Sequence, residues 1–107
     1  VALWLLQERA TFTIIRSNTK EPQRFLRSAE IIISGLGKPN YITDDLIKEG
    51  AILIDAGTSE SEGRLVGDVD IESVKKRASY VTPVPGGIGP LTVAVLLRNL
   101  VVLSRKR

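Results

Sequence analysis

The sequence predicts an α/β domain built on a doubly wound, mostly parallel sheet with helices on both faces. Short apolar segments typical of strands alternate with segments typical of helices, as in successive βαβ units. Strands of a parallel sheet are buried on both faces, and Glu30–Ser34 and Ala51–Ala56 each contain a continuous apolar run that suits this position. The 107 residues are enough for one domain and too few for two.

Local signals place the elements along the chain. The expected strands are rich in apolar and β-branched residues and are Thr11–Ile15, Glu30–Ser34, Ala51–Ala56 and Ser79–Val84. The expected helices begin at a cap, a proline or an apolar run and are Val1–Leu6, Pro22–Ser28, Asp44–Lys48, Asp70–Arg77 and Pro90–Ser104. The glycines in Ser61–Asp68 indicate a loop or a small hairpin.

The composition excludes several classes of chemistry. The chain has no Cys and no His, so disulfide scaffolds, thiol nucleophiles, Cys/His metal sites and histidine general bases are ruled out. Lys and Arg outnumber Asp and Glu by 15 to 12, and the excess lies in Arg105–Arg107, which argues against a nucleic-acid-binding face. The longest apolar run, Val93–Leu97, is much shorter than the ~20 residues that cross a bilayer. We therefore expect a cytoplasmic protein with no membrane segment and no metal site.

The last helix is too apolar for a domain that stands alone. Its apolar residues surround most of the helix, which is typical of a helix buried on more than one side. The sheet covers one side only, so we expect the helix at 90–105 to pack against a further domain. The chain also begins with the apolar segment Val1–Leu6 and without Met. We interpret it as the C-terminal piece of a longer protein, with a processed N-terminus as the alternative.

Four connectors follow the expected strands: Arg16–Thr19, Gly35–Asn40, Gly57–Ser59 and Pro85–Pro90. In an open α/β sheet, ligands bind outside the carboxyl ends of the strands, so these connectors should line one edge together. Three of them are rich in Gly and Pro, and glycine lets the backbone approach a flat ligand closely. Any single one of them is more often an ordinary turn.

Two connectors bear on a dinucleotide. Where such folds carry an acid for the ribose hydroxyls, this chain has Arg16 and Ser17, which favours the 2′-phosphate of NADP over NAD; a solvated basic turn is the alternative. Gly35-Leu36-Gly37 is a G-x-G only, so the G-x-G-x-x-G phosphate loop is absent from these residues.

The stretch from Pro85 to Thr92 is the most informative. Its glycines free the backbone amides, and Pro90 suits the first turn of a helix, where the Thr92 hydroxyl is in reach of a ligand amide. The alternative is a rigid connector in which Thr92 only caps the helix. Asp68 and Asp70 resemble an acid–base pair, but we interpret them as a turn residue and a helix cap.

These residues carry a family resemblance. Val81–Ala94 (VTPVPGGIGPLTVA), preceded by Leu65–Val69 (LVGDV) and Gly50–Asp55 (GAILID), closely resembles the bifunctional methylenetetrahydrofolate dehydrogenase/cyclohydrolases. The resemblance covers nearly the whole chain and implies their Rossmann-type NAD(P)-binding domain, incomplete at its N-terminus, with the helix that returns to the folate domain. It implies a homodimeric enzyme that oxidises 5,10-methylenetetrahydrofolate with NADP and then hydrolyses the methenyl product to 10-formyltetrahydrofolate.

The resemblance also implies the site residues. The cofactor side would comprise Arg16, Ser17, Gly35, Gly37, Gly57, Thr58 and Thr92, and the folate side Pro85, Gly86, Gly87 and Ile88. Arg16 stands where the family commonly has His, and Gly57-Thr58-Ser59 replaces a G-I-N run. The family's folate domain, its Y-x-x-x-K motif and its G-R-S loop are missing from these 107 residues, so no catalytic residue is assigned and we expect this piece alone to catalyse neither reaction.

Two other functions remain open at this stage. Another NAD(P) dehydrogenase with a doubly wound domain, such as a 2-hydroxy-acid dehydrogenase, is disfavoured because such enzymes usually need a His. A non-catalytic remnant kept for dimerisation or docking is the other alternative.

Overall fold

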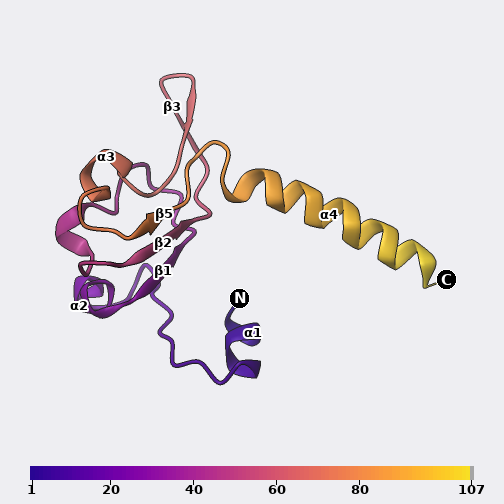
Figure 1. The fold of residues 1–107 in the computed structure, drawn as a ribbon, viewed down its shortest axis with the longest axis horizontal. Helices are drawn as coiled ribbons and strands as arrows, with labels where there is room; N and C mark the ends of the chain where they lie inside the picture. The colour runs from indigo at the N-terminus through magenta and orange to yellow at the C-terminus, as the bar shows by residue number, and fades with distance from the viewer. Residues whose placement is uncertain (107) are drawn as a thin grey trace.

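Three parallel strands form the sheet, in the order β1 (Ile31–Ser34), β2 (Ile52–Asp55) and β5 (Tyr80–Val81). The computed structural model describes residues 1–106 of the chain. Ile31 pairs with Ile52, and Ile52 pairs with Tyr80, so the strands lie in register and in chain order. Strands that pair in parallel need a crossover between them, and helical turns provide it (Figure 1). The expected α/β fold with a parallel sheet is confirmed.

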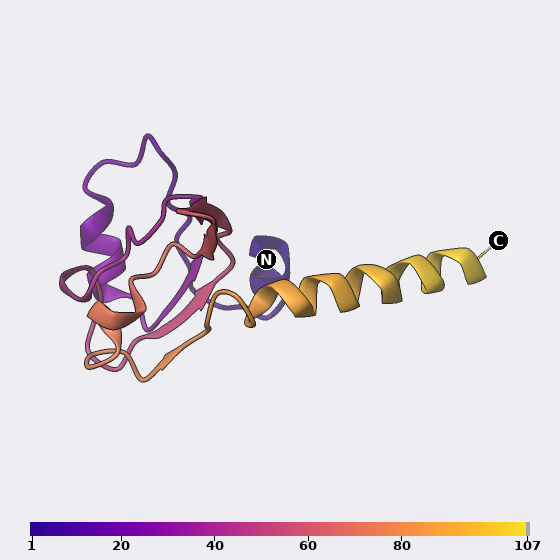
Figure 2. The same ribbon diagram turned by 90° about the horizontal axis from the view of Figure 1, so that it is seen from above.

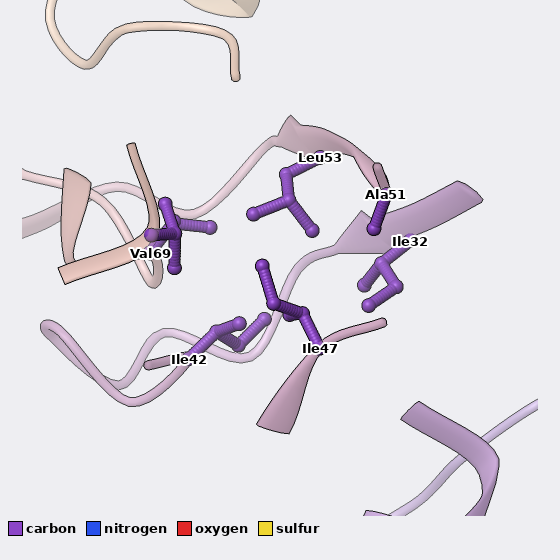
Figure 3. Close-up of a cluster of buried hydrophobic side chains, with 7 residues drawn as sticks. Ile32, Ile42, Ile47, Ala51, Leu53 and Val69 are labelled. Atoms are coloured by element: carbon purple, nitrogen blue, oxygen red, sulfur yellow. The ribbon is translucent and has the colours of Figure 1, made fainter. Parts of the chain in front are cut away.

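The hydrophobic core lies on one face of this sheet (Figure 3). Strand β1 alternates exposed and buried residues, so Ile32 points into the core while Ile31 and Ile33 are exposed. The core consists of Ile32, Ile42, Ile47, Ala51, Leu53, Val69 and Val74. The prediction of helices on both faces therefore differs from the structure of residues 1–106. The two apolar terminal helices, which have the composition to cover the second face, lie apart from the sheet (Figure 2).

The helices are α1 (Ala2–Gln7), α2 (Pro22–Ser28), the 3₁₀ turn η1 (Asp44–Leu46), α3 (Ile71–Val74) and α4 (Ile88–Arg105). The bounds of α2 agree with the prediction. The Asp70 carboxylate accepts a hydrogen bond from the Ser73 amide at 3.2 Å, so its predicted role as a cap of α3 is confirmed. Helix α4 begins two residues before Pro90, with Gly87 at the N-cap, because the glycine-rich stretch already winds into the first turn.

Thr11–Ile15 does not form the predicted strand. The second, third and fourth of the four predicted strands lie side by side, which matches strands 3, 4 and 5 of the doubly wound order 2-1-3-4-5. In that order a first strand lies between the second strand and the third. No strand of residues 1–106 occupies that place, so Thr11–Ile15 has no strand to pair with.

An antiparallel hairpin of β3 (Ser59–Ser61) and β4 (Arg64–Val66) stands off the body (Figure 1). Its turn residues Glu62 and Gly63 have φ angles of 52° and 74°, which suits a two-residue hairpin turn. The hairpin alternative predicted for Ser61–Asp68 is thus confirmed, although the hairpin starts two residues earlier.

Helix α4 projects away from the body along its whole length (Figure 2), and none of its residues is buried. With 18 residues and a mean hydropathy of 1.5, it meets the length and composition of a membrane-spanning helix, which differs from the prediction of no membrane segment. Arg98 lies in its middle, and a cation at that depth opposes insertion into a bilayer. An apolar helix of this kind equally suits packing against a second domain.

Candidate ligand-binding edge

The connectors after β1, β2 and β5 meet at the carboxyl edge of the sheet. The Ala56 amide donates to the Ser34 carbonyl at 2.8 Å, which joins the ends of β1 and β2. The Asp55 amide donates to the Thr82 hydroxyl at 2.8 Å, which joins β2 to the segment after β5. The strand ends that precede three of the four predicted connectors therefore lie together at this edge.

Asp55, the last residue of β2, holds two segments at this edge. Its carboxylate accepts hydrogen bonds from the amides of Gly57 at 2.9 Å, Asp68 at 3.2 Å and Val69 at 3.0 Å. The side chain is almost completely buried, at 2% exposure. A buried carboxylate is costly unless its oxygens are satisfied, and these three amides satisfy it. Asp55 thereby fixes the chain that returns from the hairpin.

Asp68 extends this network to the connector after β1. Its carboxylate accepts from the Ser34 hydroxyl at 2.6 Å and from the amides of Leu36 at 2.7 Å and Lys38 at 3.0 Å. Asp68 is fully buried. The interpretation of Asp68 as a simple turn residue is wrong, because the hairpin return carries it under the Gly35–Lys38 loop, where loop amides need an acceptor.

Two glycines make room for these carboxylates. A Cβ atom at Gly57 would lie 2.3 Å from Asp68 Oδ1, and one at Gly67 would lie 2.0 Å from Asp55 Oδ2. No side chain fits at such distances, so glycine is required at both positions. Gly57, predicted to let a cofactor approach, is buried and accommodates Asp68 on the side where its side chain would be.

Gly35 and Gly37 face open space. Both are exposed, and a Cβ at either would meet no atom within 4 Å. The amides of Leu36 and Lys38, between and after them, are turned inward to Asp68. The loop therefore presents its glycines outward, as a flat ligand requires. Thr58 is also exposed, directly after this cluster.

Arg16 and Ser17 lie in an exposed turn, which the Arg16 amide closes by donating to the Thr19 hydroxyl at 2.8 Å. Among residues 1–106, no hydrogen bond joins this turn to the other connectors. The expectation that it lines the same edge lacks support here, because the strand that would carry it there does not form.

The glycine-rich loop before α4 is tightly folded. A Cβ at Gly87 would lie 2.2 Å from the Pro83 carbonyl oxygen, and Gly86 has a φ of +99°, so both positions favour glycine. The Val84–Pro85 bond is cis. The Thr92 hydroxyl donates to the Ile88 carbonyl at 3.0 Å, so Thr92 neither caps the helix nor offers its proton outward.

Two concave surfaces were found, and most of the predicted site residues line neither of them. A depression of about 260 Å³ borders the carboxylate cluster and is lined by Asn40, Asp55, Val66, Gly67, Val69, Asp70, Ile71, Glu72 and Val84. None of the predicted cofactor residues lines it. Ile88 and Thr92 instead share an open apolar surface of α4 with Leu91, Val95, Leu96 and Asn99. Gly35 and Gly37 line neither surface, so a ligand-sized crevice over them needs residues from outside this structure.

Sequence reasoning missed the residues that organise the edge, namely Ser34, Asp55, Asp68 and Thr82. One signal was available for Asp55. A charged residue that ends a continuous apolar strand and is followed by Ala-Gly has no place on a solvated face, so it points to a buried carboxylate with local amide donors. Ser34 and Asp68 carried no such signal, since their contact spans 34 positions in the sequence.

An ion pair of Glu30 and Lys48 lies outside this cluster. Glu30 precedes β1, and its own backbone amide and the Lys48 ammonium, 3.2 Å away, lower the pKa of its carboxyl. The pair is exposed and lies at the start of the strand, so it takes no part in the edge.

Comparison with known proteins gives one consistent answer. Residues 1–107 match the family described as tetrahydrofolate dehydrogenase/cyclohydrolase, NAD(P)-binding domain. The bifunctional protein FolD of Lactobacillus acidophilus is 47% identical over 107 residues, covering 100% of this chain and 38% of that protein. That of Clostridium novyi is 50% identical over 100 residues, covering 94% of this chain and 36% of that protein.

Solved structures agree. The bifunctional FolD methylenetetrahydrofolate dehydrogenase/cyclohydrolase of Campylobacter jejuni superposes with a TM-score of 0.92 at 44% identity, covering 99% of this chain and 38% of that one. The Trypanosoma brucei enzyme, solved with NADP cofactor and inhibitor, has a TM-score of 0.84 at 40% identity, covering 95% of this chain and 37% of that one. The chain thus spans well under half the length of the proteins it matches.

Proposed function

Because the chain belongs to the tetrahydrofolate dehydrogenase/cyclohydrolase family through its NAD(P)-binding domain, we propose that it supplies the dinucleotide side of a bifunctional enzyme. That enzyme oxidises 5,10-methylenetetrahydrofolate with NADP and hydrolyses the methenyl product to 10-formyltetrahydrofolate. The observation that carries the proposal is the carboxyl edge, where two buried carboxylates hold the connectors of β1 and β2 with Gly35 and Gly37 facing outward.

The residues at this edge fit a dinucleotide. Gly35 and Gly37 leave open space over the loop, which suits the close approach of a flat ring or a ribose. Arg16 and Ser17 lie in an exposed turn that no hydrogen bond of residues 1–106 joins to this edge. We propose that they supply a guanidinium and a hydroxyl for the 2′-phosphate of NADP, with NAD as the weaker ligand. When bound, the dinucleotide accepts a hydride, and the protein supplies its position and orientation.

The folate side is proposed for Pro85, Gly86, Gly87 and Ile88. The close approach of Gly87 to the Pro83 carbonyl makes this loop compact, so it presents backbone rather than side chains at the start of α4. The loop brings no general acid or base, and we propose that the catalytic groups come from a folate domain outside these residues. The 107 residues alone then catalyse neither reaction.

We also propose that α4 packs on that folate domain. Its apolar side chains are exposed all round, with Leu96 at 66% and Leu100 at 64%. A homodimer is supported by the β3–β4 hairpin, which projects with unpaired edges and with Leu65 exposed. A cytoplasmic location follows from the metabolic role.

Equilibrium titration of the full-length protein with NADP and with NAD tests the cofactor assignment. We expect NADP to bind more tightly, and Arg16→Gln to raise its Kd by about tenfold while leaving the Kd of NAD unchanged, because the guanidinium contacts only the 2′-phosphate. Lys20→Gln removes an equal charge from the same turn and serves as the control. Absence of binding of either dinucleotide would refute the proposed function.

A further inference from the structure

The loop after β1 is held from beneath by one acid. The buried Asp68 carboxylate accepts three hydrogen bonds from this segment. The donors are the Ser34 hydroxyl and the amides of Leu36 and Lys38. Charge-assisted hydrogen bonds of this kind are about twice as strong as neutral ones. This is the main restraint on a loop with two glycines, one of them, Gly37, at a φ of +70°.

The bonds to Asp68 also set the path of the loop backbone. The amides at positions 36 and 38 are turned inward, and the glycines at 35 and 37 are exposed to open space. Leu36 and Lys38 are exposed as well, so every residue from Gly35 to Lys38 lies at the surface while the two amides bond beneath it. The bonds to Asp68 therefore fix the backbone of a loop that leaves open space over both of its glycines.

Asp68 is itself held in place. The Asp55 carboxylate accepts hydrogen bonds from the amides of Asp68 and Val69. Because Gly57 and Gly67 have no side chain, the two carboxylates can pack directly against the backbone at these positions. A chain of hydrogen bonds thus connects Asp55 at the end of β2 to Asp68, and Asp68 to the Gly35–Lys38 loop. The Thr82 hydroxyl, which accepts the Asp55 amide, ties the segment after β5 to the same network.

We propose that Asp68 is a positioning residue for the dinucleotide, which it never touches: it pre-organises the Gly35–Lys38 loop with its glycines toward the ligand. The proposal rests on the proposed function and adds a residue to it. Ordering a glycine-rich loop on binding costs conformational entropy, so a loop held in advance binds more tightly. Loss of the restraint should weaken dinucleotide binding without altering chemistry that uses no dinucleotide.

Asp68→Asn in the full-length protein is the direct test. Asparagine keeps the shape but turns one acceptor into a donor, so it cannot accept from all three groups. We expect the Kd of both NADP and NAD to rise at least about tenfold, measured by titration calorimetry. Amide exchange at Leu36 and Lys38 should become faster without any ligand, while the amide of Leu53 in the core stays protected.

Hydrolysis of methenyltetrahydrofolate needs no dinucleotide and should keep its kcat and KM in this variant. A merely structural role would lower this rate as well, so the comparison separates the two. Asp70→Asn is the matched control, because that carboxylate lies two residues away and, within residues 1–106, bonds only to Ser73. It should leave both dinucleotide affinities unchanged.

Ser34→Ala covers the case in which Asp68→Asn fails to fold. It removes one donor and leaves the two loop amides bonded, so we expect about a threefold rise in the Kd of each dinucleotide. Unchanged affinity in either folded variant overturns the proposal. If the wild-type protein binds no dinucleotide, the proposed function itself fails, and that result is recognised before any variant is made.

Discussion

Gly57 and Gly67 are positions where a neighbouring side chain, and not the backbone conformation, requires glycine. Both have ordinary negative-φ backbone, and their requirement for glycine comes from the carboxylates packed against them. Gly57 was predicted to let a ligand approach, because a glycine after a strand commonly serves that purpose. The steric reason at this position lies inside the protein, in a contact between residues that are distant along the chain.

Gly67→Ala tests this contact. The added methyl would lie 2.0 Å from Asp55 Oδ2 and 2.9 Å from Val84 Cγ2, so the buried carboxylate must move away from its amide donors. We expect a loss of about 3 kcal/mol in the free energy of unfolding, measured by denaturant titration. Gly89→Ala is the control, since a Cβ there meets nothing within 4 Å and lies in a helix; it should be neutral or stabilise by up to about 1 kcal/mol.

At the scale of elements, several predictions that rest on local signals are confirmed, whereas the predicted strand that depends on a distant partner does not form. Helix α2 has a proline in its first turn, and α3 has the Asp70 cap, so local chemistry set their starts. The apolar runs of β1 and β2 were equally clear. Thr11–Ile15 has strand composition, but a strand exists only where another strand offers hydrogen-bonding groups.

The same reasoning explains why only some of the connectors predicted at one edge lie there. The connectors after β1 and β2 lie at one edge because their strands pair, which sequence order and apolar runs predict. Arg16 and Ser17 depend on the unpaired segment and were not brought there. The contact from Asp68 to the Gly35–Lys38 loop depends on where the β3–β4 hairpin returns, and no local signal specifies that path.

Amide exchange at Thr11–Ile15 tests the explanation for the missing strand. In the isolated 107-residue chain these amides should exchange rapidly, because no strand pairs with them. In the full-length protein, where we propose a further strand between this segment and β1, they should be protected by at least about a hundredfold. The β2 amides serve as the control and should be protected in both. Rapid exchange in both proteins would show that Thr11–Ile15 is a loop.

The whole molecule exposes more surface than a protein of its mass should. A compact monomer of 11.7 kDa has an accessible surface of about 5,900 Å². This structure has 8327 Å², and its radius of gyration is 15.5 Å where about 13 Å is typical. Helices α1 and α4 account for much of the difference, since both stand away from the body with apolar side chains exposed (Figures 1 and 2). Apolar surface on this scale marks an interface.

The isolated 107-residue chain should therefore self-associate. We expect its sedimentation coefficient to rise with concentration in the micromolar range, because the apolar surface of α4 lacks the domain on which we propose it packs. Leu96→Lys with Leu100→Lys places two charges on one side of α4 and should return the chain to a monomer. In the full-length protein the same pair should lower the melting temperature by several degrees, since it breaks the proposed domain contact.

Asn99→Lys with Ser104→Lys adds the same charge to α4 at polar positions and is the matched control. It keeps the apolar side chains, so the isolated chain should still associate and the full-length protein should keep its melting temperature within about 1 °C. Equal effects of the two pairs would assign the association to charge rather than to apolar surface. A monomeric wild-type chain that binds no apolar dye would show that α4 folds back on its own body, and the proposed contact with a folate domain would then be wrong.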